Sequence, residues 1–159
     1  MNIVIIGSGG REHALCYKLL KSSKINKIYC IPGNAGTDEI ATNIFADIND
    51  FDEIYKIVLK LNVELIVVGP EIPLVNGIVD YFEKKNIKIF GPNKKCSQLE
   101  GSKFFMKNIC KKYNIPSAKY FEISDINQIE KFLSSVSFPV VVNSDGLAAG
   151  KGVPICNNL

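Results

Sequence analysis

The residues best suited to do chemistry are the glycines and the lysine of residues 145–153, which read Asp-Gly-Leu-Ala-Ala-Gly-Lys-Gly-Val. They follow the apolar run 138–142 and precede a short segment with the composition of a strand, 153–156. Glycines around a lysine directly after a strand predict a loop whose backbone N–H groups can approach phosphate closely. We therefore expect 145–153 to form a glycine-rich flap over a nucleotide, between two antiparallel strands.

A P-loop is the alternative for the same segment, and the spacing argues against it. A P-loop has four residues between its two glycines, and its lysine is followed by Ser or Thr. Here three residues separate Gly146 from Gly150, and Gly152 follows Lys151. The segment also leads to a strand-like stretch rather than to a helix.

Other glycine-bearing loops follow short apolar segments earlier in the chain. They are 7–10 (Gly-Ser-Gly-Gly), 32–37 (Pro-Gly-Asn-Ala-Gly-Thr), 69–74 (Gly-Pro-Glu-Ile-Pro-Leu) and 91–92 (Gly-Pro). Backbone N–H groups of Gly9 and Gly10 at a helix start would favour an anion. A tight turn that needs small residues explains the same glycines and stays open.

Two polar residues near these loops also have competing interpretations. Glu71, between two prolines, is predicted to accept hydrogen bonds from sugar hydroxyls, and a solvated acid in the first turn of a helix is the alternative. His13 is the only histidine, and we expect it to pack against a neighbouring element or orient a loop rather than to catalyse. The loop 32–37 is richer in glycine than an ordinary turn requires, although a plain turn remains possible.

The elements that position these loops alternate between apolar strands and helices of 3.6-residue period. We expect strands at 3–6, 27–31, 64–68 and 88–90, and helices at 11–20, 51–61 and 74–82. This alternation predicts an α/β fold with one parallel, Rossmann-like sheet flanked by helices. Ligands of such sheets bind at the carboxyl ends of the strands, so the four early loops should converge on one rim.

The pattern changes after Pro92. We expect a helical stretch over 97–113 that is interrupted near Gly101, a strand at 119–122, a helix at 125–134 and a strand at 138–142. We place a domain boundary at Gly101. The chain then consists of an N-terminal α/β domain, 1–101, and the beginning of a second, incomplete domain, 102–159.

Composition narrows the class of protein. The chain has 159 residues, 47% of them hydrophobic and 22% charged, which is ordinary for a soluble globular protein. Its lysines are dispersed, so we expect no nucleic-acid partner. Five widely spaced cysteines without a C-x-x-C pair favour reduced thiols in a cytoplasmic protein over a disulfide framework or a zinc site. No stretch reaches the ~20 apolar residues of a membrane span, and the N-terminus lacks a signal peptide's features, so we expect no membrane partner.

A nicotinamide-dependent oxidoreductase is disfavoured. The third glycine of the dinucleotide fingerprint G-x-G-x-x-G falls at Glu12. The second expected strand ends in Ile31 and Pro32, where that fold places an acidic residue for the ribose.

Taken together, the motifs resemble the phosphoribosylamine–glycine ligase family, ATP-grasp enzymes of purine biosynthesis. The matching segments are 7–15, 32–37, 68–74, 90–92, 98–103 and 145–153. They occur in family order and extend over the whole chain, and their combination is far more specific than any one loop. The resemblance implies a pre-ATP-grasp domain followed by the truncated beginning of an ATP-grasp domain.

The resemblance also implies a reaction and its sites. ATP would phosphorylate the glycine carboxylate with the help of Mg²⁺ or Mn²⁺, and the amine of phosphoribosylamine would attack the acyl phosphate to give glycinamide ribonucleotide. The implied phosphoribosylamine-binding residues are Gly9, Gly10, Asn34, Ala35, Gly36 and Glu71. The implied nucleotide-binding residues are Lys103, Asn143, Asp145, Gly146, Gly150, Lys151 and Gly152.

Two departures from the family pattern bear on activity. Where the family has Lys-Ala-Asp-Gly before its flap, this chain has Asn143, which lacks the positive charge facing ATP phosphate. A charge-assisted contact is about twice as strong as a neutral one. The family's catalytic, metal-binding and glycine-binding residues are expected beyond Leu159. We therefore expect the 159-residue chain to be inactive alone, with a separate chain carrying the rest of the enzyme as one candidate partner. A non-catalytic phosphosugar-binding or partner-binding remnant is the alternative function.

Overall fold

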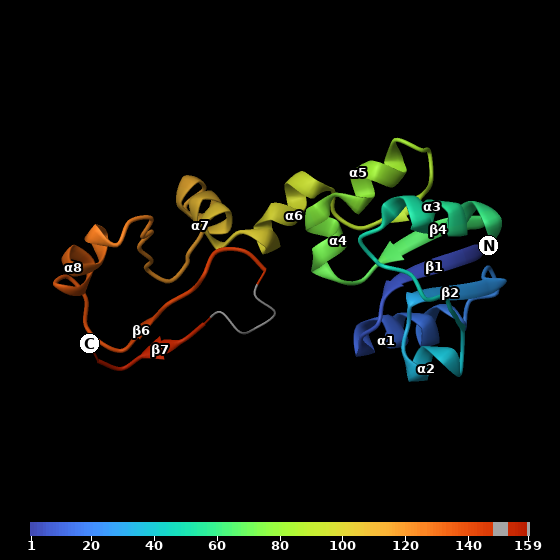
Figure 1. Cartoon of the computed structure of the whole chain (residues 1–159), viewed down its shortest axis with the longest axis horizontal. Helices are drawn as coiled ribbons and strands as arrows, with labels where there is room; N and C mark the ends of the chain where they lie inside the picture. Colours follow the sequence, from blue (N-terminus) through green and yellow to red (C-terminus); the bar gives the residue numbers. More distant parts are fainter. Residues whose placement is uncertain (148–152, 159) are drawn as a thin grey trace. The chain divides into compact units, whose positions relative to one another are not determined.

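The structure is a computed structural model that describes residues 1–147 and 153–158. The chain divides into two compact units, Met1–Ser97 and Gln98–Leu159 (Figure 1). No helix in the described part of the chain is both long and apolar enough to cross a membrane.

A five-stranded sheet forms the centre of the first unit. Its strands are β1 (Asn2–Gly7), β2 (Lys27–Pro32), β3 (Thr42–Asn43), β4 (Val63–Val68) and β5 (Ile89–Phe90). All neighbouring pairs are parallel, in the order β3-β2-β1-β4-β5. The predicted parallel, Rossmann-like sheet is confirmed. The chain changes direction across the sheet between β1 and β4, which is where such folds bind ligands.

Helices cover both faces of this sheet. They are α1 (Gly10–Leu19), α2 (Ala35–Asp38), α3 (Phe51–Lys60), α4 (Glu71–Asn76) and α5 (Ile78–Glu83), followed by α6 (Lys94–Gly101). Alternate residues of β1 point to opposite faces, so Ile3 and Ile5 pack with α1 while Val4 and Ile6 pack with α3 and α5. All four are at most 1% exposed, and each such side chain contributes roughly 1.5–3 kcal/mol by burial.

Three local features of the first unit differ from expectation. The helix predicted over 74–82 is two helices, because Gly77 adopts the left-handed conformation at φ 96° between α4 and α5. A short helix, α2, begins within the expected loop 32–37 and ends one residue beyond it, because Asn34 caps it. The two-residue strand β3 is too short to give a period-two pattern.

The second unit contains α7 (Lys103–Lys112), α8 (Asn127–Leu133), β6 (Val140–Val141) and β7 (Ile155–Cys156). β6 and β7 pair antiparallel, which confirms that antiparallel strands flank 145–153. The helical stretch is interrupted as predicted, since α6 ends at Gly101 and Ser102 caps α7. The strand predicted at 119–122 is wrong: these residues pair with no other strand in the described part of the chain.

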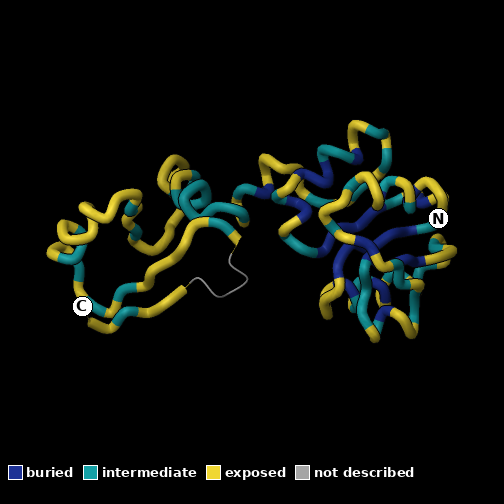
Figure 2. The backbone as a smooth tube through the Cα atoms, viewed as in Figure 1, coloured by how far each residue is buried: buried dark blue, intermediate teal, exposed yellow. Residues whose placement is uncertain are grey.

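Burial differs sharply between the two units. Figure 2 shows that the buried residues are concentrated in the sheet of the first unit, whereas the described residues of the second unit are intermediate or exposed. Among its described residues, 98–147 and 153–158, none is buried. Large apolar side chains such as Phe121 and Ile155 are 58% and 64% exposed.

We therefore predict that backbone amides of α7 and α8 exchange with solvent much faster than those of β1, β2 and β4. Local opening costs least where few apolar contacts are lost. Amide hydrogen exchange of the 159-residue chain, followed by NMR or mass spectrometry, measures this difference. Equal protection in both units would contradict the prediction.

Candidate functional site

The carboxyl ends of β1, β2 and β4 bring three of the predicted loops together. Gly7, the last residue of β1, lies opposite Pro32 of β2, and its carbonyl accepts a hydrogen bond from the Gly33 N–H at 3.2 Å. On the other side, the Gly69 N–H donates to the Ile6 carbonyl at 3.0 Å. The loops 7–10, 32–37 and 69–74 therefore meet at one rim of the sheet.

The start of α1 offers free backbone donors at this rim. The first intrahelical hydrogen bond runs from His13 N–H to the Gly9 carbonyl, so the N–H groups of Gly10, Arg11 and Glu12 have no acceptor within the helix. Gly10 is exposed, and a Cβ built on it would meet no atom of the described residues within 4 Å. The helix dipole adds positive potential at this end. An anion at the rim would find its donors here.

The buried carboxylate of Glu12 fixes the shape of this helix start. Its Oε2 accepts the Gly9 N–H at 2.6 Å, so that donor is used internally and Gly10 is the first donor left open. A Cβ on Gly7 would lie 2.7 Å from the Glu12 side chain, and one on Gly69 would overlap Oε1. Glycine is therefore required at both positions, because the carboxylate fills the space.

Asn34 holds the loop 32–37 against the loop 7–10. Its Nδ2 donates to the carbonyls of Ser8 and Gly9 at 2.9 and 3.2 Å, while its Oδ1 accepts the Thr37 N–H at 2.9 Å. The Thr37 hydroxyl, fully buried, accepts the Asn34 N–H at 2.7 Å and lies 2.7 Å from Asn43 Oδ1. Asn43 Nδ2 completes the network by donating to the Asn34 carbonyl at 2.8 Å.

Gly36 and His13 meet between α2 and α1. A Cβ on Gly36 would lie 2.5 Å from Cε1 of the His13 ring. The imidazole therefore packs closely on the glycine, which supports the loop-orienting interpretation of this histidine. Ala35 begins α2 beside Gly36, so the three predicted residues of this loop share one short segment.

Glu71 is the first residue of α4 and lies at the same rim. Its Oε1 accepts from Arg11 Nη2 at 3.0 Å, and the side chain is 43% exposed. A hydrogen bond from its own backbone N–H, together with the Arg11 guanidinium, holds the pKa of Glu71 below its ordinary value despite partial burial. The carboxylate is therefore ionised at neutral pH and available as an acceptor.

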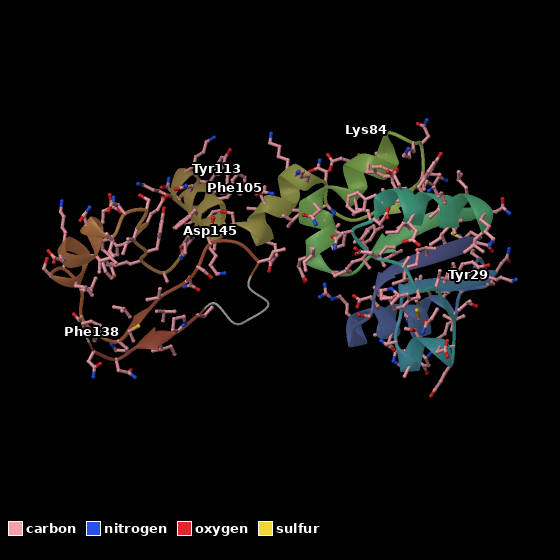
Figure 3. The ribbon with its side chains drawn as sticks, in the orientation of Figure 1. Tyr29, Lys84, Phe105, Tyr113, Phe138 and Asp145 are labelled. Carbon is pink, nitrogen blue, oxygen red and sulfur yellow. The ribbon has the colours of Figure 1, made fainter. Side chains whose placement is uncertain are left out.

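In the second unit, Asp145 binds the start of the helix that carries Lys103. Its carboxylate accepts from the Ser102 hydroxyl at 3.0 Å and from the Phe104 N–H at 3.3 Å. Figure 3 shows Asp145 beside the first turn of α7, where Phe105 is labelled. Burial raises the pKa of Asp145, but these hydrogen bonds outweigh it and hold the pKa below its ordinary value.

The remaining predicted nucleotide-binding residues lie near this contact or outside the described residues. Gly146 follows Asp145 and has φ 99°, and Asn143, two residues before Asp145, is exposed. Gly150, Lys151 and Gly152 lie outside the described residues. Within the described ranges, no three His, Cys, Asp or Glu side chains gather as a metal site would require.

Sequence reasoning missed Glu12, Thr37, Asn43 and the contacts of Arg11. A signal existed for Glu12, because an acid three residues after a helix cap typically reaches back to the cap N–H. The contacts of Asn43 and Arg11 join separate loops, and no local pattern could indicate them.

Comparison with known proteins identifies relatives of both units. The family model described as phosphoribosylglycinamide synthetase, N domain, matches residues 1–100, and that of the ATP-grasp (A) domain of the same synthetase matches 101–159. The phosphoribosylamine–glycine ligase of Caldanaerobacter subterraneus is 44% identical over 153 residues, which cover 96% of this chain and 37% of the relative. That of Clostridium acetobutylicum is 45% identical and covers 99% and 38%.

Solved structures agree with these matches. The crystal structure of phosphoribosylamine–glycine ligase from Thermotoga maritima has a TM-score of 0.75 and 32% identity, covering 99% of this chain and 36% of that one. N5-carboxyaminoimidazole ribonucleotide synthetase from the same organism has a TM-score of 0.71 at 22% identity, which shows a shared fold alone. The chain spans a little over a third of the length of the curated relatives cited above.

The network around Thr37 predicts a measurable stability difference. Thr37→Val keeps the shape of the side chain but leaves the Asn34 N–H without its acceptor, at a cost of about 1–3 kcal/mol in unfolding free energy. Thr42→Val makes the same change at an exposed position and should cost less than about 0.5 kcal/mol. Urea unfolding of both variants measures the costs, and equal midpoints would contradict the prediction.

Proposed function

We propose that this chain, which belongs to the phosphoribosylglycinamide synthetase family, supplies the phosphoribosylamine-binding part of a ligase that joins glycine to 5-phosphoribosylamine. One observation carries the proposal. The first turn of α1, whose N–H groups have no acceptor within the helix, lies at the same rim as the ionised carboxylate of Glu71. The first binds phosphate and the second accepts from hydroxyls, so together they match the two ends of a phosphoribosyl group.

Each rim residue has a part in this proposal. The N–H of Gly10 and its neighbours in the first turn of α1 bind the 5-phosphate. Gly9 shapes that turn, and Asn34, Ala35 and Gly36 close over the phosphate. Glu71 accepts hydrogen bonds from the ribose, which leaves the amine directed away from the phosphate.

The second unit contributes the nucleotide side of the proposed reaction. Bound ATP, with Mg²⁺ or Mn²⁺, supplies the phosphoryl group that activates the glycine carboxylate. Lys103 provides a positive charge for phosphate, and Asp145 fixes the first turn of α7 that carries it. Asn143, Gly146, Gly150, Lys151 and Gly152 complete the proposed nucleotide contacts. In this proposal, both units bind small molecules, and the reaction takes place in the cytoplasm.

A non-catalytic phosphosugar-binding protein is the second candidate. All of the predicted phosphoribosylamine-binding residues lie in the first unit, which also contains every buried apolar residue among those the structure describes. Binding by this unit requires no residue of the second.

We predict weak binding of glycinamide ribonucleotide at the rim, with an affinity near millimolar, on the order of 4 kcal/mol. In an NMR titration of the 159-residue chain, the amide signals of Gly10, Gly36 and Glu71 should shift. Gly10→Ala should weaken binding by about tenfold or more without unfolding the chain, because the added methyl group meets no atom of the described residues and would crowd a phosphate bound at the Gly10 N–H.

Two controls accompany this titration. Ribose without phosphate should leave the Gly10 signal unmoved at the same concentration. Shifts confined to residues 102–147, or equal affinities of the wild type and Gly10→Ala, would contradict the proposal.

A further inference from the structure

Arg11 is the only arginine in the sequence, and its guanidinium joins two loops of the rim. It lies in the first turn of α1, and its Nη1 donates to the Gly69 carbonyl at 2.5 Å. Its Nη2 donates to Glu71 Oε1 at 3.0 Å. One side chain therefore links the proposed phosphate end of the site to the proposed ribose end.

A second acidic group, Glu12, lies close to the same guanidinium. Glu12 is 4% exposed, and its Oε1 has no hydrogen-bond partner among the described residues. Arg11 Nε lies 3.7 Å from that oxygen. An unpaired buried carboxylate oxygen is costly, so the nearby positive charge favours keeping the guanidinium close to Glu12. The arginine therefore has two anchors, the Glu12 carboxylate near Nε and the Gly69 carbonyl at Nη1.

The geometry of the guanidinium restricts how Glu71 can turn. The group is planar and presents its N–H donors in a rigid fork, so fixing Nη1 on Gly69 also fixes the direction of Nη2. Glu71 Oε1 follows that direction. An ionised carboxylate has about four acceptor positions; Arg11 Nη2 uses one, and the backbone N–H of Glu71 itself uses a second. The others remain available, in a fixed orientation, to a ligand.

We propose that Arg11 is a positioning residue that orients Glu71 to accept from the two neighbouring hydroxyls of a ribosyl group, and so selects ribose over deoxyribose phosphates. This inference rests on the proposed function, because it requires a sugar phosphate at the rim. A lysine would keep the positive charge but not the fork, and it cannot hold Gly69 and Glu71 in one fixed geometry.

Paired titrations with ribose 5-phosphate and 2-deoxyribose 5-phosphate test the inference. The wild type should bind the ribose compound about tenfold more tightly, since the deoxy compound leaves one acceptor position of Glu71 unpaired. In Arg11→Lys this ratio should fall to about one, while affinity for the deoxy compound changes by less than about threefold. A purely structural defect would weaken both ligands equally and leave the ratio unchanged.

Two further variants serve as a charge control and as an independent test of the Glu71 carboxylate. Lys18→Met removes a positive charge from the last turn of the same helix and should leave the ratio at its wild-type value. Glu71→Gln alters an exposed side chain and should lower the ratio even if Arg11→Lys folds poorly. In wild type, a side-chain carbon titration should give Glu71 a lower pKa than in Arg11→Lys.

The outcomes separate the two proposals. An unchanged ratio in folded Arg11→Lys, or in Glu71→Gln, would overturn the positioning role while leaving phosphosugar binding intact. No binding of either sugar phosphate to the wild type would overturn the proposed function, and the inference with it.

Discussion

The hydrogen bond from the Gly9 N–H to the buried carboxylate of Glu12 is the interaction on which the candidate site depends. It turns the chain from β1 into α1 and places the side chain in the space between Gly7 and Gly69. Those glycines are required for that reason rather than for turn formation alone. Because Gly9 has no side chain, the next N–H groups of the helix stay open at the rim.

The rest of the rim is built around this turn by contacts between loops. Asn34 fastens the loop after β2 to the carbonyls of Ser8 and Gly9, and its own geometry depends on the buried hydroxyl of Thr37. Arg11 fastens the loop after β4 from the other side. The parallel register of β1 with β2 and β4 makes these short bridges possible, since it brings all three strand ends to one level.

The sequence was sufficient to predict the parallel sheet, because buried strands and amphipathic helices each carry a local period. It also placed three of the four early glycine-bearing loops at one rim, and antiparallel strands on either side of 145–153. The sequence could not reveal that Arg11 contacts Glu71, because the two residues are 60 positions apart. They meet only because β1 and β4, the strands that precede them, are neighbours in the sheet. The strand predicted at 119–122 fails for a related reason: its aromatic residues are typical of strands, but no strand among the described residues pairs with them.

We propose that the turn held by Glu12 and the carboxylate of Glu71 together bind the two ends of a phosphoribosyl group. A crystal structure of the chain with glycinamide ribonucleotide would locate both ends. We expect the phosphate within hydrogen-bonding distance of the Gly10 N–H and the ribose hydroxyls on the Glu71 carboxylate, with the hydrogen bond between Gly9 and Glu12 intact. A ligand phosphate bound at Lys103, or a ribose that does not touch Glu71, would contradict it.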